Sequence, residues 1–160
     1  MIRAGKFGDI PRLVEIMQEA HAASPYADIC EVDVKEAKRT LMGCLQRHGG
    51  NHEGSTFVAV AEKDGRVEGY IIGILQRFYT VTDKLEATDL QWFCTKKVSA
   101  RDPIKLVKAM HKWAQKSPDV VAVFQANIDL WVDHAAVTRA LEGIGMKKCG
   151  DILRKDLNDE

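Results

Sequence analysis

The residues best able to do chemistry lie between positions 96 and 116, a segment with seven basic residues and one acid, Asp102. The basic residues are Lys96, Lys97, Arg101, Lys105, Lys108, Lys112 and Lys116. The last four recur at helical spacing and predict one stripe on a helix that runs from about 103 to 116. Because the start of a helix presents free N–H groups and a partial positive charge, it can hold a phosphate. This segment is therefore a candidate anion site.

The residues at this helix start favour such a site only in part. Ser99 and Ala100 are small and would let a ligand approach the backbone. Asp102, the candidate cap, brings a carboxylate that opposes an anion, and Pro103 lacks an N–H group. The alternative interpretation is that the basic stripe is simply the solvated face of a surface helix.

The composition bounds the classes of protein that need to be considered. A chain of 160 residues with 46% hydrophobic content can bury one core, which predicts a single domain over residues 1–160. Twenty-three basic residues balance 23 acidic ones, so no overall field attracts nucleic acid or a membrane surface. We therefore expect neither as a partner. A nucleic-acid-binding module that uses the 96–116 stripe remains a weaker alternative.

Cysteine usage and apolar run length indicate the cellular compartment. The four cysteines are scattered, without a Cys-x-x-Cys pair, which favours reduced thiols in a cytoplasmic protein. No apolar run approaches the length of a membrane span, and the first residues do not resemble a signal peptide. We expect a soluble protein.

Hydrophobic periodicity and turn residues predict an α+β fold in which helices interrupt a mixed sheet. Helices are expected over 9–23, 33–45, 103–116 and 134–145. Strands are expected over 1–4, 56–62, 67–79, 89–95 and 120–126, with a last strand or hairpin over 146–157. Asp9 and Asp33 are the expected caps of the first two helices, Glu36 completes a capping box, and Gly145 closes the last helix.

This order of elements resembles the GNAT superfamily of acyl-CoA-dependent N-acetyltransferases over essentially the whole chain. The resemblance is carried by the strand DLQWFCT, the following helix KLVKAMHKWA, and the ending ALEGIGMKKCGDILRKDL. HAASPYAD and AMHKWA resemble a branch that is often found in bacteriophage genomes. The resemblance implies a mixed, mostly antiparallel sheet flanked by about four helices. It also implies acetyl-CoA as the co-substrate and a possible homodimer.

In that family a loop Arg-x-x-Gly-x-Gly/Ala after the fourth strand binds the pyrophosphate of coenzyme A. Val98, Arg101 and Pro103 align with its three defining positions, so none of the three matches. The resemblance still implies a modified pyrophosphate loop, in which Arg101 supplies a cation. The cofactor-binding residues it implies are Trp92, Phe93, Cys94, Val98, Ser99, Ala100, Arg101, Asp102 and Ile104.

The resemblance also assigns candidate catalytic residues. Leu141 aligns with the family's tyrosine acid, and His134 aligns with a frequent asparagine. Because leucine cannot donate a proton, the acid would be His134, Tyr79 or Cys94, or the thiolate would leave unassisted. The base that deprotonates the amine is expected near the fourth strand. Asp89 is the first choice there and Glu86 the second, although a strand-end carboxylate is more often solvated or capping.

Trp92 and Phe93 are expected on opposite faces of their strand, with core packing as the commoner role for either. The backbone of this strand would pair with the pantetheine arm. Acceptor binding is expected at Tyr26 and Asp28, and also at Tyr79. A polar loop without function explains the first two equally well.

A metal site is not expected, although Cys44, His48 and His52 are spaced four residues apart. The glycines at 49 and 50 break the helix that would align them, and no fourth ligand is near. The sequence as a whole predicts direct acetyl transfer from acetyl-CoA to a primary amine of a small molecule or protein. The alternative is a GNAT-type chain that has lost catalysis and serves as a ligand- or protein-binding module.

Overall fold

The computed structural model describes residues 1–126 and 133–150. The chain divides into two compact units, residues 1–126 and residues 127–160. The expectation of one domain over 1–160 therefore stays a prediction. Over the described ranges, no helix is long and apolar enough to cross a membrane.

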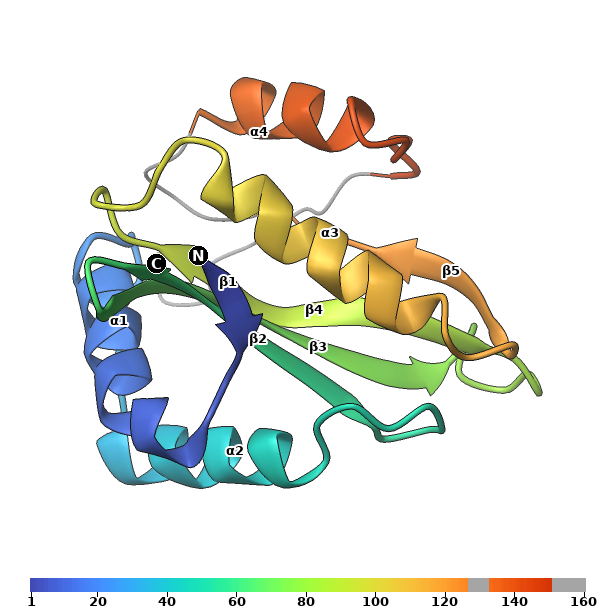
Figure 1. Ribbon diagram of the computed structural model, residues 1–160, viewed down its shortest axis with the longest axis horizontal. Coiled ribbons are helices and arrows are strands. Elements are labelled where there is room, and N and C mark those ends of the chain that lie inside the picture. Colours follow the sequence, from blue (N-terminus) through green and yellow to red (C-terminus); the bar gives the residue numbers. More distant parts are fainter. Residues whose placement is uncertain (127–132, 151–160) are drawn as a thin grey trace, which may run out of the picture. The chain divides into compact units, whose positions relative to one another are not determined.

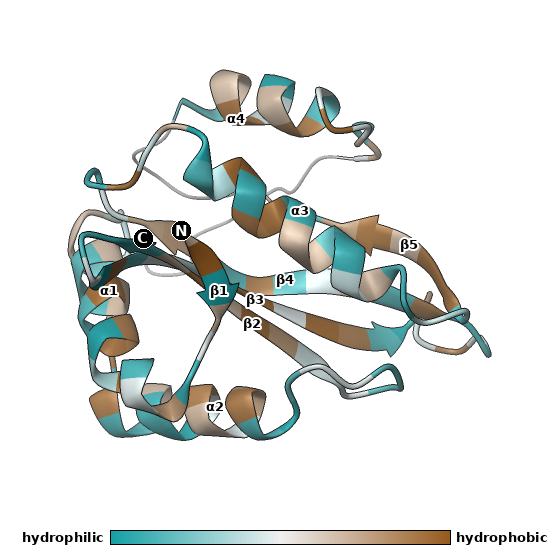
Figure 2. Cartoon of the chain, viewed as in Figure 1, coloured by the Kyte–Doolittle hydropathy of each residue, from teal (hydrophilic) through white to brown (hydrophobic). Residues whose placement is uncertain are grey.

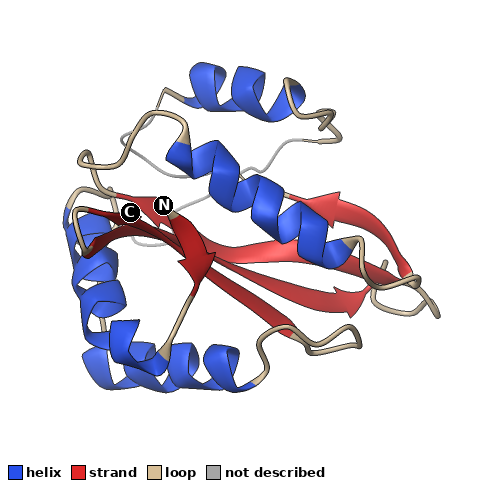
Figure 3. Ribbon diagram, viewed as in Figure 1, coloured by secondary structure: helices blue, strands red, loops and turns tan. Residues whose placement is uncertain are grey.

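The first unit is built on one sheet whose five strands lie in chain order (Figure 3). They are β1 (Ile2–Ala4), β2 (Thr56–Lys63), β3 (Arg66–Arg77), β4 (Leu85–Cys94) and β5 (Val120–Phe124). Neighbouring strands pair antiparallel, except that β4 and β5 pair in parallel. The predicted mixed and mostly antiparallel sheet of an α+β fold is confirmed.

Helices cover both faces of this sheet (Figure 1). On one face lie α1 (Ile10–Ala22) and α2 (Val34–Gln46), and on the other lies α3 (Asp102–Ala114). In Figure 2 the strands between these layers are largely brown, which marks apolar residues, over β2 and β3. The second unit contributes α4 (His134–Glu142).

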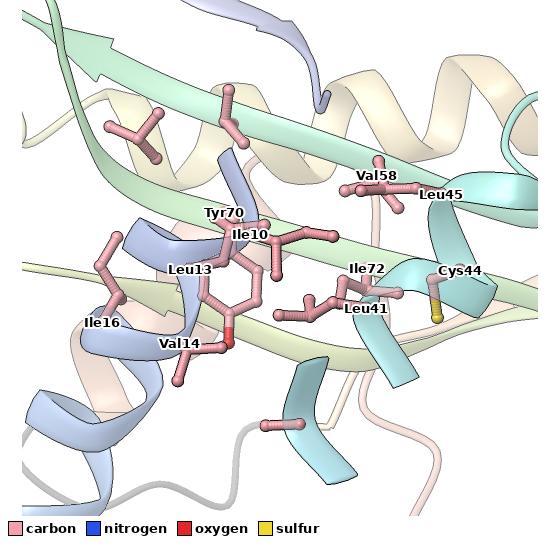
Figure 4. Close-up of a cluster of buried hydrophobic side chains, with 13 residues drawn as sticks. Ile10, Leu13, Val14, Ile16, Leu41, Cys44, Leu45, Val58, Tyr70 and Ile72 are labelled. Atoms are coloured by element: carbon pink, nitrogen blue, oxygen red, sulfur yellow. The ribbon is translucent and has the colours of Figure 1, made fainter. Parts of the chain in front are cut away.

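The main core lies between the sheet and the first two helices, around Tyr70 of β3 (Figure 4). Leu13 of α1, Leu41 of α2 and Val58 of β2 surround it, each with no exposed surface. Burial of one such side chain contributes about 1.5–3 kcal/mol. The Tyr70 hydroxyl donates to Gln91 Oε1 at 3.0 Å, which satisfies its one polar group. Burial raises the pKa of Tyr70 well above its ordinary value, so this phenol stays neutral.

The opposite face of the sheet packs closely against α3. A Cβ atom on Gly73 of β3 would lie 2.7 Å from the Met110 sulfur, so any larger residue at this position would force Met110 to shift. Trp113 stacks on Phe57 at 5.4 Å between ring centroids, and its indole N–H donates to Gly50 O at 2.9 Å. The α3 helix is thereby fixed over the middle of the sheet.

The three helix starts of the first unit differ from expectation in two cases. Asp33 caps α2 as predicted, but Glu36 pairs with Arg39 and does not close a capping box. Asp9 lies in a 3-10 turn (Phe7–Asp9), where its carboxylate accepts from the Lys6 N–H and from Arg3. Asp9 holds the cap position of α1, as predicted, but its side chain makes no cap bond to that helix, because the ion pair with Arg3 engages it.

At α3 the expected cap was wrong. Arg101 occupies the cap position and makes no side-chain cap bond, while Asp102 is already the first helical residue. The Asp102 carboxylate reaches back to the Ser99 N–H at 3.2 Å. The helix ends at Ala114, two residues before the predicted end.

Two strand boundaries differ from the predicted ones, the start of β4 and the end of β3. The β4 strand begins at Leu85 and not at 89, because residues 85–88 pair with β3 on one side and β5 on the other. The β3 strand ends at Arg77, where the chain turns with positive φ at Tyr79 and Thr80.

Residues 133–150 contain α4, capped by Asp133, whose side chain accepts from the Ala136 N–H. The helix ends at Glu142, three residues before the predicted end, and Gly145 follows with φ of 93°. Residues 146–150 are not in a strand, so that part of the expected final strand was wrong. Positions 151–157 lie outside the described residues.

Candidate functional site

The candidate site begins where β4 and β5 separate. Their parallel ladder runs from Leu85 and Val120 to Thr88 and Phe124, and β5 then ends. Just beyond this point β4 contains a bulge, because Ile72 pairs with Gln91 while Gly73 pairs with Asp89. Leu90 is the extra residue and is half exposed. The second half of β4 therefore pairs with β3 alone among the described strands.

The pairing register shows which backbone groups of β4 remain open. The Thr95 N–H donates to Glu68 O at 2.8 Å, so Thr95 faces β3. Because facing alternates along an antiparallel pair, Phe93 also faces β3, whereas Trp92 and Cys94 direct their N–H and C=O groups away from it. This free strand edge can pair with an extended ligand that carries amide groups.

Trp92 and Phe93 lie on opposite faces, as predicted. Phe93 packs edge to face against Tyr70 in the main core, with ring centroids 5.7 Å apart. Trp92 pairs with Ile71 and so shares the α3 face of the sheet. Its indole N–H is buried without a hydrogen-bond partner in the described structure, and so are both amide atoms of Gln125.

These polar atoms lie near the point of separation. Gln125 directly follows Phe124, the last residue of β5, and so comes beside Asp89. An unpaired buried polar group costs about 1–3 kcal/mol, and such groups are rare in folded proteins. The indole N–H and the carboxamide therefore offer unused hydrogen-bond capacity beside the open strand edge.

The loop between β4 and α3 was predicted to hold an anion, and most of its N–H groups are already engaged. Lys97 donates to Thr95 Oγ1 at 3.2 Å, Val98 to Thr95 O at 3.4 Å, and Ser99 to Asp102 Oδ2. Four N–H groups donate to no acceptor in the described ranges, that of Lys96 early in the loop and those of Ala100, Arg101 and Ile104 at the helix start. This set at the helix start is enough for one phosphate group.

Charge around this helix start is mixed. Asp102 is buried, with 6% of its surface exposed, and its carboxylate pairs with Lys105 at 2.9 Å. The bond from Lys105, with those from Ser99, outweighs burial and lowers the pKa of Asp102. The carboxylate is thus charged at neutral pH. Exposed cations oppose its effect, namely Lys96, Lys97, Arg101, Lys108 and Lys112.

Cys94 closes the α3 side of this strand end. Burial and the charge of Asp102 raise the pKa of its thiol to about 12. The thiol therefore stays protonated at neutral pH and cannot act as a thiolate nucleophile. A Cβ atom on Gly69 would lie 2.6 Å from its sulfur, so a larger residue at 69 would displace it.

The two candidate bases do not come together. Asp89 pairs with Gly73 on the α3 face and its carboxylate accepts from the Ala126 N–H at 3.1 Å, at the end of the β4–β5 ladder. Glu86 pairs with Gln76 on the other face, and accepts from its side chain at 2.7 Å. Asp89 therefore borders the open strand edge and Glu86 does not.

His134 is the first residue of α4 and is exposed. It belongs to the second compact unit, whereas Asp89 belongs to the first. Leu141 lies in the same helix as His134 and has no proton to donate. The identity of the acid stays a prediction.

The expected acceptor residues are separated in space. Tyr26 and Asp28 belong to the segment between α1 and α2. That segment lies at the left of Figure 1, on the same side as the loop between β4 and α3. The turn between β3 and β4, which carries Tyr79, projects at the right of the same figure. Tyr79 is 79% exposed there, so it does not share a wall with the other two.

His48 and Cys44 have structural partners. The His48 Nδ1 atom accepts from the Val58 N–H at 2.9 Å, and burial with the nearby Lys116 charge lowers its pKa. Cys44 is buried, and burial raises the pKa of its thiol. Within residues 1–126 and 133–150, no three histidine, cysteine or acidic side chains group as metal ligands.

No family model and no curated protein sequence matches this chain. Solved structures do match over nearly its full length. An acetyltransferase from Trypanosoma brucei has a TM-score of 0.69 at 13% identity, over 98% of this chain and 99% of the other. Glucosamine-6-phosphate N-acetyltransferase from Arabidopsis thaliana has a TM-score of 0.67 at 12% identity, over 99% and 98%. A transcriptional regulator from Bacillus halodurans has a TM-score of 0.70 at 16% identity, over 98% and 99%.

These likenesses show the fold, and the chain has the α+β fold of the GNAT acetyltransferases. At such low identity they do not carry an activity from one chain to another. The presence of a transcriptional regulator among the matches makes the same point.

Sequence reasoning missed several residues of the site. Gln125 offered one signal, because it is the polar residue that ends the apolar run VVAVF. Glu68 offered another as the acid within the apolar stretch VEGYIIGIL. The bulge at Leu90 gave no signal, since it depends on the pairing of β3 with β4.

Proposed function

We propose that this protein transfers an acetyl group from acetyl-CoA to a primary amine of a small molecule or protein, by direct transfer. The observation that carries the proposal is the separation of β4 from β5 at the Leu90 bulge, which leaves the Trp92 and Cys94 backbone open. The pantetheine arm of coenzyme A is extended and contains two amides, which suits this edge. Membership of a bacteriophage branch stays a prediction.

The residues present suit acetyl-CoA in two further respects. The free N–H groups of Ala100, Arg101 and Ile104 would bind a phosphate group just beyond the strand end. The Trp92 indole N–H and the Gln125 amide would bind polar atoms of the arm or of the acyl group. Acetyl-CoA would supply the activated thioester, and the chain would align it with the amine.

Asp89 is the base in this proposal. It borders the open edge at the end of the β4–β5 ladder, where its carboxylate accepts from the Ala126 N–H. Removal of the amine proton must precede attack on the thioester. Glu86, on the other face of the sheet, is the second choice.

A second function is favoured by one observation, the carboxylate of Asp102 at the helix start. It occupies the Ser99 N–H and adds a buried negative charge where a phosphate would lie. A chain of this fold that binds a ligand or protein without catalysis would fit that feature, as would Leu141 at the family's acid position.

An acetyl-transfer assay with a panel of amines and lysine peptides separates the two functions. The proposal expects turnover above the uncatalysed rate with at least one amine. It also expects a large loss in Asp89→Asn and retained activity in Glu86→Gln, whereas the reverse result would assign the base to Glu86. Acetyl-CoA binding without turnover on any acceptor would favour the binding module.

A further inference from the structure

We propose that Glu68 is a positioning residue for the loop of residues 95–101, which it holds through Thr95 in the conformation that binds the donor phosphate. The inference rests on the proposed function and adds a residue that lies outside the ligand-binding set. Glu68 is in β3, and its side chain is 4% exposed.

Both buried carboxylates of the described residues contact this loop. Among those residues only Glu68 and Asp102 are buried acids, with 3% and 6% of their surfaces exposed. Glu68 contacts the first residue of the loop, and Asp102 contacts Ser99 near its end. Burying a carboxylate is costly, and the cost is offset only by strong partners. Both ends of the loop are therefore held by charge-assisted hydrogen bonds.

The contacts of Glu68 explain why it stays charged. Its Oε2 atom accepts from Thr95 Oγ1 at 2.8 Å and from Arg12 Nη2 at 2.9 Å. Burial alone would raise the pKa of Glu68, but the bonds from Thr95 and Arg12 outweigh it and lower the pKa. Arg12 also donates to Val67 O at 2.9 Å, which fixes the guanidinium against β3.

Thr95 connects the Glu68 carboxylate to the backbone of the loop. Its hydroxyl donates to Glu68 and at the same time accepts from the Lys97 N–H at 3.2 Å. Its carbonyl accepts from the Val98 N–H at 3.4 Å. Lys63 of β2 donates to Lys97 O at 2.9 Å and adds a third attachment. The open N–H groups of Ala100 and Arg101 follow directly on this anchored segment.

Loss of the contact would release the loop and weaken donor binding without removing any ligand contact. Thr95→Val removes the hydroxyl at nearly constant shape. We expect the dissociation constant for acetyl-CoA to rise about tenfold, which corresponds to the backbone entropy of about one freed residue. Thr95→Ser keeps the hydroxyl and should bind within about twofold of the unaltered chain.

Thr56→Val is the matched control. Its hydroxyl is fully buried and donates to Cys44 O, at the opposite end of β2 from Lys63. It should lose at least as much stability as Thr95→Val and bind acetyl-CoA unchanged. In turnover, Thr95→Val should raise KM for the donor and leave KM for the amine unaltered, a split that a general loss of stability does not produce.

Calorimetric titration of acetyl-CoA into the full chain and the three variants tests the inference. Weaker binding by Thr95→Val, rescue by Thr95→Ser and no change in Thr56→Val would support it. Equal binding by Thr95→Val and the unaltered chain would overturn it and leave the proposed function intact. No binding by the unaltered chain would overturn both. Should Thr95→Val not fold, Glu68→Gln gives the same comparison, and unchanged donor affinity there would overturn the inference.

Discussion

The starts of α2 and α3 differ in whether a side chain of the protein accepts from the free N–H groups of the helix. At α2, Asp33 has an extended backbone and its carboxylate accepts from the Lys35 and Glu36 N–H groups. At α3, Arg101 has a helical backbone and no side-chain cap bond. The Lys35 and Glu36 N–H groups of α2 are thus closed by the chain itself, while those of Arg101 and Ile104 at α3 remain open in the described ranges.

This difference indicates which of the two helix starts can bind a ligand. A capped helix start gains about 1 kcal/mol of stability and loses its capacity for an anion. An uncapped start forgoes that stability, and this one lies just past the end of β4, which pairs with β3 alone among the described strands. The α3 start is therefore a candidate for function, and the α2 start is structural.

The largest effect is expected from reversing the charge at the open start. Arg101→Asp brings a carboxylate to the cap position of α3 and changes the local charge by two units. Two charge contacts at about 4 Å are worth about 2 kcal/mol, so acetyl-CoA should bind roughly 30-fold more weakly. Calorimetry measures this, with Arg101→Ala as the variant that loses only the cation.

A contrary result is equally informative. If Arg101→Asp bound acetyl-CoA as well as the unaltered chain, the phosphate would not lie at this helix start. The distinction drawn between α2 and α3 would then have no functional meaning.

A smaller effect of opposite sign is expected at Asp102. Asp102→Asn keeps an oxygen for the Ser99 N–H but removes the charge, and should strengthen acetyl-CoA binding up to about tenfold. Asp119→Asn is the matched control, because it breaks another aspartate–lysine pair, with Lys84 at 3.0 Å, far along the chain. Weaker binding by Asp102→Asn, with Asp119→Asn unchanged, would mean that the charge organises the loop and does not repel the ligand.

The smallest effect is expected at the closed start. Asp33→Ala should lower the free energy of unfolding by about 1 kcal/mol, because two N–H groups of α2 lose their acceptor. Denaturation in urea measures the loss. Acetyl-CoA affinity should not change, and a change would show that the two helix starts are coupled.

The lowered pKa of Glu68 predicts how the stability of the protein depends on pH. Because its folded pKa is lowered, its contribution to stability is present above the unfolded value of about 4.3 and is lost as pH falls through the folded value. Urea midpoints between pH 3 and 7 should therefore decline less steeply for Glu68→Gln than for the unaltered chain. If the urea midpoints of the two chains declined in parallel, Glu68 would not contribute to the loss of stability in acid.

Local patterns in the sequence were sufficient for elements that depend on neighbours along the chain. Asp33 before an apolar repeat identified its helix start, and alternation placed Trp92 and Phe93 on opposite faces. The start of β4 was missed because residues 85–88 follow a polar segment and are recognisable only from their pairing with β3 and β5.

The site was harder to predict from the sequence because it depends on contacts between residues that belong to different elements. Which N–H groups of the loop stay open depends on Asp102, whose carboxylate accepts from Ser99. The role of Glu68 depends on Thr95, 27 residues away in the chain. The resemblance to GNAT acetyltransferases predicted the fold, which is confirmed, and the role of the loop, which stays a prediction. The contacts within the loop came from the structure.

The most direct test of the central claim is calorimetric titration of the unaltered chain with acetyl-CoA. The open edge of β4 and the open start of α3 predict saturable binding at one site per chain, and binding should weaken as salt concentration rises, because phosphate contacts contribute. Absence of binding, or binding that ATP alone reproduces with equal affinity, would contradict the claim that the strand edge and the helix start hold the two parts of one donor.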